Sequence, residues 1–180
     1  MTNGASQHLF MILVGGHTPT SNLEVHDMRF AVGERIEDTF ETLQSEWWGN
    51  PDTLHLDVWS KIICVDGFDV RLKAEPYAGE DKLFFINLGG YDPSHFDELH
   101  KNILVVAPSV AHAKIKAKES VTHWQVPHKD TAFEIEKIIP LASVGNLFVH
   151  LEKSSAPVPF SFEWGYTPIS KKALAKKKAS

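Results

Sequence analysis

One 19-residue stretch occurs twice in this chain of 180 residues, and this repetition restricts the possible folds more than any other feature. LFMILVGGHTPTSNLEVHD begins at Leu9, and LFFINLGGYDPSHFDELHK begins at Leu83, a shift of 74 residues. At this shift, 9 of the 24 positions in 9–32 and 83–106 are identical, including the Gly-Gly pair, the proline and the Glu-x-His motif. We therefore predict that the two segments adopt the same local structure.

Each copy continues with a helical pattern and then with two strand patterns. The apolar residues of the two predicted helices recur every three or four positions, as on one face of a helix: Ile36, Phe40, Leu43 and Trp47 in the first copy, and Val110, Ala113, Ala117 and Val121 in the second. The strand patterns are LHLDVWSKIICV and FDVRLK, joined by Asp66-Gly67, a strong turn signal. In the second copy they are HKDTAFEIEKII and LFVHLEK, an alignment that matches His55-Leu56-Asp57 with His128-Lys129-Asp130.

These patterns predict an α+β protein made of two tandem ββαββ repeats. The first repeat spans 8–75, a linker spans 76–82, the second repeat spans 83–152, and a proline- and aromatic-rich extension with a basic tail spans 153–180. A helix that connects two strands favours a parallel arrangement of those strands, so we expect a mixed sheet with one helix in each repeat.

The predicted repeats need each other, because one helix covers only one face of a sheet. We expect the remaining apolar faces to pack together with pseudo-twofold symmetry, as in a dimer formed within one chain. In the extension, the alternation of Phe160, Phe162 and Trp164 indicates an edge strand or a segment that covers an exposed face.

The composition is that of an ordinary globular protein, with 43% hydrophobic and 23% charged residues. The single cysteine, Cys64, allows no internal disulfide and follows Ile62-Ile63, so we predict a buried, inert thiol in a reducing compartment. The apolar run 9–14 is much shorter than the roughly 20 residues that span a bilayer, and it lacks the flanks of a signal peptide. We expect a cytoplasmic protein without membrane contact.

The net charge of −5 conceals an uneven distribution. Five lysines lie in the last ten residues, and without them 13 basic residues face 23 acidic ones. An acidic body argues against a nucleic-acid groove, so nucleic acid remains a possible partner only for the lysine tail. A solvated terminus is the preferred interpretation of that tail.

The motifs LFMILVGG, EVHD, HLDVW, VDGF, LFFINLGG and ELHK, in this order, resemble a bacterial family known as domain of unknown function 1543. That family occurs in one or two copies per chain. The resemblance covers about residues 8–152 and leaves out the extension from Lys153. It implies no activity, cofactor or catalytic residue, because none is assigned to the family.

Histidines and carboxylates two positions apart supply the candidate site residues, because such pairs share one face of a strand. They are Glu24, His26, His55 and Asp57 in the first copy, and Glu98, His100, His128 and Asp130 in the second. The preferred interpretation is structural, since a carboxylate can fix the tautomer of a histidine and attach a loop to a strand. A site for a ligand comes next, and a metal site comes last; we therefore predict ligand-binding candidates without a metal or cofactor.

The glycine pairs Gly15-Gly16 and Gly89-Gly90 are further ligand-binding candidates, because their backbone N–H groups could face an anion. Neither pair leads into a helix or precedes the lysine of a phosphate-binding loop. A close approach or a bulge is the preferred interpretation.

The sequence contains no complete catalytic motif, and we therefore lean towards a protein that is not an enzyme. The predicted function is a duplicated module that binds a small molecule or another protein, with a homodimer as one possible assembly. The alternative is a metal-assisted hydrolase that uses the Glu-x-His and His-x-Asp residues.

Overall fold

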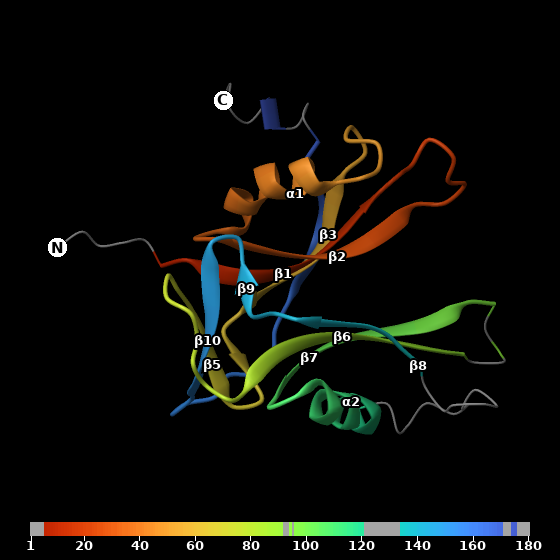
Figure 1. The fold of residues 1–180 in the computed structure, drawn as a ribbon. Coiled ribbons are helices and arrows are strands. Elements are labelled where there is room, and N and C mark those ends of the chain that lie inside the picture. Colours follow the sequence, from red (N-terminus) through yellow and green to blue (C-terminus); the bar gives the residue numbers. More distant parts are fainter. Residues whose placement is uncertain (1–5, 92–93, 95, 121–133, 171–173, 176–180) are drawn as a thin grey trace.

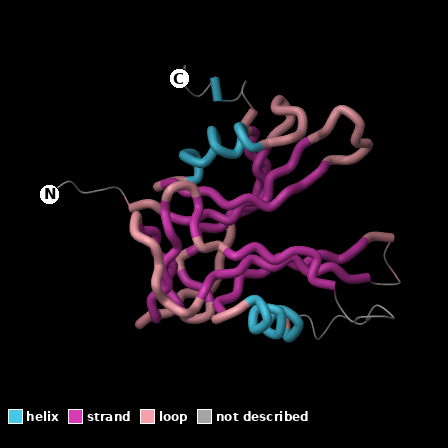
Figure 2. Tube along the Cα trace, viewed as in Figure 1, coloured by secondary structure: helices cyan, strands magenta, loops and turns pink. Residues whose placement is uncertain are grey.

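The structure, a computed structural model, describes residues 6–91, 94, 96–120, 134–170 and 174–175. Its elements form an α+β fold with three sheets, and helices α1 and α2 lie on opposite outer sides of the molecule (Figures 1 and 2). The α+β class predicted from the sequence is confirmed. None of the helices within these residues is long and apolar enough to cross a membrane.

The first sheet contains four strands, in the order β11 (Glu163–Pro168), β3 (His55–Ile62), β1 (His8–Gly16) and β2 (Val25–Gly33). A 3-10 turn over Ile36–Thr39 leads into α1 (Phe40–Glu46), which covers the outer face of this sheet (Figure 1). Strand β11 lies at the edge beside β3, so the extension does add an edge strand.

The second sheet has the order β7 (Glu98–Ala107), β6 (Lys82–Tyr91) and β8 (Glu134–Pro140). Helix α2 (Val110–Glu119) lies against its outer face (Figure 1). A third sheet, here called the linking sheet, has the order β4 (Cys64–Val65), β5 (Phe68–Lys73), β10 (Leu147–Lys153) and β9 (Ser143–Val144).

All strand pairs that the structure describes are antiparallel, so the prediction of mixed sheets was wrong. Strands β2 and β3, on either side of α1, do run parallel to each other, but β1 lies between them and pairs with both. A short connection makes β2 the neighbour of β1, and the helix then carries the chain to the other side of β1. Strands β7 and β8 flank β6 in the same way.

The outer strands also differ from the prediction, which assigned them to the sheet of their own repeat. Strand β5 pairs instead with β10 along six residues, from Phe68↔Lys153 to Lys73↔Phe148. The two halves of the chain therefore share backbone hydrogen bonds as well as side-chain contacts.

The predicted apolar stripe of the first helix is buried against the first sheet. Phe40 and Leu43 of α1, together with Trp47, are at most 8% exposed and pack in one cluster with Phe10 and Ile12. The apolar stripe of helix α2 is narrower than predicted, because Ala113 and Ala117 are its buried residues whereas Val110 is 45% exposed. Val121, the last residue of the predicted second stripe, lies outside the described residues.

A separate apolar cluster fills the space between the inner faces of the sheets. It contains Leu9 and Met11 of β1, Leu83 and Phe85 of β6, and Val149 of β10 among its members. The ring of Phe30 on β2 meets that of Phe85 edge to face, with a centroid distance of 5.3 Å. Each half therefore covers the inner apolar face of the other.

The predicted turn at Asp66-Gly67 is confirmed, with φ of 51° and 79° at the two residues. Asparagine, aspartate and glycine are the residues that tolerate this left-handed backbone. Oδ2 of Asp66 also accepts hydrogen bonds from the backbone N–H of Val106 and from Nζ of Lys116, at 2.9 and 3.0 Å. The turn thus attaches the first half to β7 and α2. Cys64, just before the turn, is buried and unbonded to another cysteine, as predicted.

Candidate functional site

Gly15 is the centre of a row of three residues that crosses the first sheet. It pairs with His26 on β2 and with His55 on β3. Paired residues on neighbouring antiparallel strands point to the same face, so two imidazoles flank a position that has no side chain. A Cβ atom on Gly15 would lie 2.6 Å from Nε2 of His55 and 2.8 Å from Oδ2 of Asp57. Any larger residue at position 15 would therefore clash with the side chains of His55 and Asp57.

Asp57 joins these histidines because strand β3 contains a β-bulge. Leu56 pairs with Val14 and Val58 pairs with Leu13, which leaves Asp57 as the extra residue between them. A bulge changes the direction of a side chain and is frequent beside functional sites. Here it adds a carboxylate to the inner face of the sheet.

We call Glu24, His26, His55 and Asp57 the first cluster. Glu24 immediately precedes β2, and its Oε1 lies 2.9 Å from Nε2 of His55, while its Oε2 lies 3.7 Å from Nε2 of His26. Asp57 is shared in the same way, with Oδ1 3.4 Å from Nε2 of His55 and Oδ2 3.3 Å from Nε2 of His26. All four residues predicted from the first copy thus meet in one place.

His55 is the most buried member, with a side chain that is 3% exposed. Its Nδ1 lies 2.8 Å from the backbone carbonyl oxygen of Thr53. A carbonyl can only accept a hydrogen bond, so Nδ1 carries a proton, and in the neutral ring the lone pair of Nε2 faces the cluster. Both Nε2 of His55 and Oδ2 of Asp57 are buried without a hydrogen-bond partner. The ring of Tyr166, from β11, lies over the His55 ring with a centroid distance of 4.3 Å.

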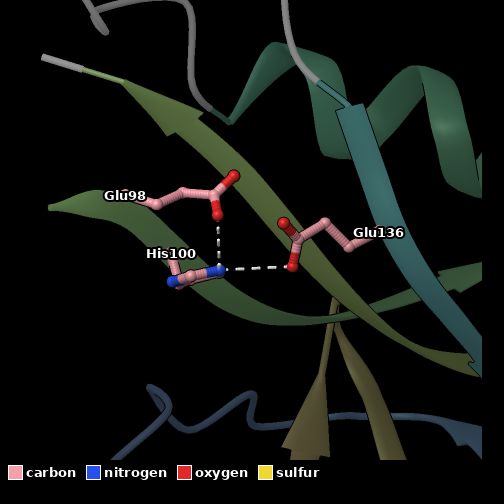
Figure 3. A group of neighbouring side chains, drawn as sticks. All are labelled: Glu98, His100 and Glu136. Carbon is pink, nitrogen blue, oxygen red and sulfur yellow. Dashed lines mark ion pairs between the residues drawn. The ribbon is translucent and has the colours of Figure 1, made fainter.

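The second sheet repeats this arrangement with different residues. Gly89 pairs with His100 and with Glu134, and Glu136 is the extra residue between the pairs Leu88↔Ile135 and Asn87↔Lys137. We call Glu98, His100 and Glu136 the second cluster (Figure 3). Nε2 of His100 lies 3.8 Å from Oε2 of Glu98 and 3.3 Å from Oε2 of Glu136. The three side chains are 34–45% exposed, so this cluster is more open than the first.

The predicted equivalence of His55 and Asp57 with His128 and Asp130 was wrong. The strand register gives Glu134 and Glu136 as the counterparts, because Gly15 pairs with His55 whereas Gly89 pairs with Glu134. The second half has additional residues between its helix and its third strand, and these shift the alignment. His128 and Asp130 themselves lie outside the described residues.

The two glycines of the first pair face opposite sides of the first sheet. A Cβ atom on Gly16 would lie 2.8 Å from Cζ2 of Trp47, on the side covered by α1. A Cβ atom on Gly89 would clash with Oε1 of Glu136. Gly15, Gly16 and Gly89 are therefore positions of close approach, as the preferred interpretation predicted, and Gly90 follows Gly89 in strand β6.

A cleft of about 600 Å³ lies between the inner faces of the first and second sheets. Its polar lining comes from both halves and includes one histidine of each cluster: His26, Asp27, Asn87, His100, Asn102, Glu136 and Lys137. Leu13, Met28, Phe85 and Ile139 supply the apolar part of the lining.

Three contributors were missed by sequence reasoning. Glu136 was hidden by the shifted alignment, although an alignment of the EIEKII segment with HLDVWS would have brought it opposite Asp57. Thr53 contributes a backbone carbonyl, which no side-chain motif reveals. Tyr166 belongs to the extension, where the alternation of aromatic residues predicted a strand but not its contact with His55.

Comparisons with known proteins give a family without an assigned activity. A family model described as Domain of Unknown Function (DUF1543) matches residues 21–72. A crystal structure of protein Il1583 from Idiomarina loihiensis is similar to this chain, with a TM-score of 0.73 and 30% sequence identity. The similarity covers 92% of this chain and 99% of that one. No curated protein matches the sequence.

The predicted resemblance to the DUF1543 family is therefore confirmed over residues 21–72, which belong to the first copy. The matched residues 21–72 contain the whole first cluster.

Proposed function

We propose that the protein is a duplicated binding module that holds a small polar molecule in the cleft between its first and second sheets. The observation that carries this proposal is that His26 and His100, one from each cluster, line the same cleft. Concave sites with an apolar lining and a few convergent polar groups are typical of small-molecule binding.

The lining favours a positively charged ligand of moderate size. A volume of about 600 Å³ is within the roughly 300–1,000 Å³ range of small-molecule sites. Asp27 and Glu136 line the cleft, and the carboxylates of Glu24, Asp57 and Glu98 lie beside its two histidines. Lys137 is the cationic side chain among the described lining residues. An organic amine with a short apolar body would match this combination of charges and apolar surface.

Three features support the view that the module arose by tandem duplication with pseudo-twofold symmetry. The elements β1, β2, α1, β3, β4 and β5 recur in order as β6, β7, α2, β8, β9 and β10. Strands β3 and β8, the third strand of each half, carry a bulge at Asp57 and at Glu136. Val70-Arg71-Leu72 of β5 corresponds to Val149-His150-Leu151 of β10. Each of these valines pairs with the leucine of the other strand, and Arg71 pairs with His150 between them, so the register is reciprocal. Self-complementary pairing of this kind is the mark of a twofold interface.

The proposal is tested by calorimetric titration with spermidine as the probe and citrate as the anionic control. We expect spermidine to bind and citrate not to bind, and we expect His26→Ala and His100→Ala each to weaken the spermidine affinity. His17→Ala is the matched control, because His17 is exposed and is not part of the cleft lining. Spermidine affinity that is unchanged in both cleft variants would contradict the proposal, as would an absence of spermidine binding.

A metal-assisted hydrolase is the second candidate, and one observation favours it: in the first cluster, each of two imidazoles lies within 3.7 Å of an oxygen of both carboxylates. Such groups can hold an ion and transfer protons. This candidate predicts turnover of p-nitrophenyl phosphate in the presence of Mn²⁺ that disappears in Asp57→Asn. A binding module without catalysis shows no turnover above that of Mn²⁺ alone.

A further inference from the structure

We infer that the first cluster is a binding site for a divalent transition-metal ion, with Nε2 of His26, Nε2 of His55 and the carboxylates of Glu24 and Asp57 as ligands. This inference goes beyond the proposed binding module, and it shares the first cluster with the hydrolase candidate but requires no catalysis.

The position of His55 is the first argument. Its Nε2 is buried, makes no hydrogen bond and faces carboxylate oxygens of Glu24 and Asp57 at 2.9 and 3.4 Å. A lone pair directed at two carboxylates is unfavourable unless a cation lies between them. The other ring nitrogen donates to the backbone carbonyl of Thr53, and this is how metal-binding histidines are usually held.

Protonation of His55 alone does not provide partners for both buried atoms, Nε2 of His55 and Oδ2 of Asp57. A proton on Nε2 of His55 would have Glu24 within reach, yet that oxygen lies outside hydrogen-bonding geometry in spite of the 2.9 Å separation. Oδ2 of Asp57 is also buried without a hydrogen bond, and its nearest imidazole nitrogen is Nε2 of His26 at 3.3 Å, so two protons, one on each imidazole, would be needed. An ion that contacts several ligands at once can satisfy both.

The distances between imidazole and carboxylate atoms can be compared with those around an ion. Ligands about 2.1 Å from a metal lie ~3.0 Å apart at right angles and ~3.4 Å apart at tetrahedral angles. Nε2 of His55 lies 2.9 and 3.4 Å from Oε1 of Glu24 and Oδ1 of Asp57, and Nε2 of His26 lies 3.7 and 3.3 Å from the other two oxygens, Oε2 and Oδ2. With one ligand atom taken from each residue, the group of described residues that lies within 4.8 Å is the second cluster, so the side chains of the first cluster must move inwards to close on an ion.

The donor atoms indicate which ions would bind. Calcium and magnesium prefer oxygen ligands, whereas two imidazoles with two carboxylates suit zinc and its first-row neighbours. The cluster is closed on the side of His55 and open on the side of His26, whose side chain is 45% exposed. An ion could therefore enter from the cleft.

The second cluster is an internal comparison. One ligand atom from each of Glu98, His100 and Glu136 lies within 4.8 Å of the others, so an ion could be held there as well. All three residues are exposed, however, and no buried unpartnered atom is found among them in the described part of the chain. Exposed groups of this kind do not need a cation, and we restrict the inference to the first cluster.

The test is calorimetric titration of untagged, full-length protein with Zn²⁺ after treatment with EDTA. We expect one Zn²⁺ ion per chain at the tight site. Glu24→Gln and Asp57→Asn keep the side-chain shape but remove the charge. Each should lower the affinity for Zn²⁺ by more than the ~10- to 100-fold that is lost when a residue hydrogen-bonded to a metal ligand is changed. Circular dichroism before titration verifies that each variant is folded.

The matched controls are Glu98→Gln and Glu136→Gln in the second cluster, which should leave the tight Zn²⁺ site intact. Co²⁺ provides an independent readout, because removal of an imidazole by His26→Ala should change its visible absorption spectrum. Zn²⁺ affinity that is unchanged in Glu24→Gln and Asp57→Asn would overturn the inference. An absence of Zn²⁺ binding, or equal losses in the second-cluster variants, would overturn it too.

These outcomes are separable from the test of the proposed function. His100→Ala should weaken spermidine binding in the cleft without affecting the tight Zn²⁺ site. A protein that binds spermidine but not Zn²⁺ would refute only the metal site, and the reverse result would refute only the proposed ligand.

Discussion

The two halves of this protein use one backbone plan to produce two chemically different clusters. In the first, Gly15 is flanked by His26 and His55, and the bulge carries Asp57. In the second, Gly89 is flanked by His100 and Glu134, and the bulge carries Glu136. The central glycine, the bulge and one histidine are common to both. The buried histidine is present only in the first.

This difference separates what the scaffold requires from what a ligand would require. A glycine paired with residues on both neighbouring strands and a bulged carboxylate recur in both halves, so they follow from the backbone plan. A buried imidazole nitrogen without a partner is unfavourable for folding, at roughly 1–3 kcal/mol. His55 is thus the residue whose presence is hardest to explain by structure alone.

The helices provide the largest expected difference between the halves. Leu43→Ala removes a buried side chain from a cluster that contains Phe40 and Trp47, and it should lower the free energy of unfolding by about 2–5 kcal/mol. Ala117→Gly in the second half removes only a methyl group and should cost about 1 kcal/mol. Urea denaturation of both variants measures the two values. Equal losses would contradict the view that the first helix carries the larger core.

Gly15 and Gly89 provide the second, smaller difference between the halves, in the stability that is lost when alanine replaces them. Gly15→Ala introduces a Cβ atom 2.6 Å from Nε2 of His55, which is buried and held by Thr53, so we expect a loss of about 1–3 kcal/mol from overpacking. In Gly89→Ala the nearest atom belongs to Glu136, whose exposed carboxylate can move away. The gain of ~0.4–1 kcal/mol from a less flexible unfolded chain should then offset much of the cost.

Thermal unfolding of Gly15→Ala and Gly89→Ala gives the comparison directly. Neither glycine has a positive φ, so alanine is compatible with the backbone at both positions. Destabilisation by Gly89→Ala that equals or exceeds that of Gly15→Ala would mean that Glu136 is held as firmly as His55.

The smallest expected difference lies at the start of the first strands, where His8 on β1 has Lys82 on β6 as its counterpart. Partial burial, and then the positive charges of Lys61 and Arg71, lower the pKa of His8 from its usual 6.5, while Glu34 acts in the opposite direction. The folded state therefore binds this proton less readily than the unfolded state. The resulting stability is complete above pH 6.5 and is lost as the pH falls from 6.5 towards the lower pKa of the folded protein.

His8→Gln should remove this contribution, so the difference in unfolding free energy between the original protein and the variant should change between pH 7.5 and 5.5. Lys82→Gln is the matched control and should show no comparable change, because it leaves the imidazole of His8 in place. A pH-independent difference for His8→Gln would contradict the assignment.

Much of the fold was predictable because it depends on local patterns. The apolar stripe with Phe40, Leu43 and Trp47 predicted the first helix, and Asp66-Gly67 predicted the turn between β4 and β5. The pairing of β5 with β10 was not predictable, because alternation indicates which face of a strand is buried but does not identify its neighbour. The order β3-β1-β2, with no parallel neighbours, was missed for the same reason.

The candidate site was predictable in the first half and only partly in the second. Glu24, His26, His55 and Asp57 were identified from their spacing, and they do meet. A bulge leaves no signal in one sequence, however, and the extra residues before β8 made His128 and Asp130 the false counterparts of His55 and Asp57. Glu136 therefore became visible only through the strand register.

The β5–β10 ladder has a practical consequence for anyone who wishes to study one half alone. A fragment that ends after β5 would leave those backbone N–H and C=O groups of Phe68–Lys73 that face β10 without the partners that they have in the complete chain, although the β4 side of the strand would stay paired. Open strand edges of this kind promote self-association and aggregation. The solubility of such fragments would then depend on two identical copies closing the edge together, in place of the missing sequence.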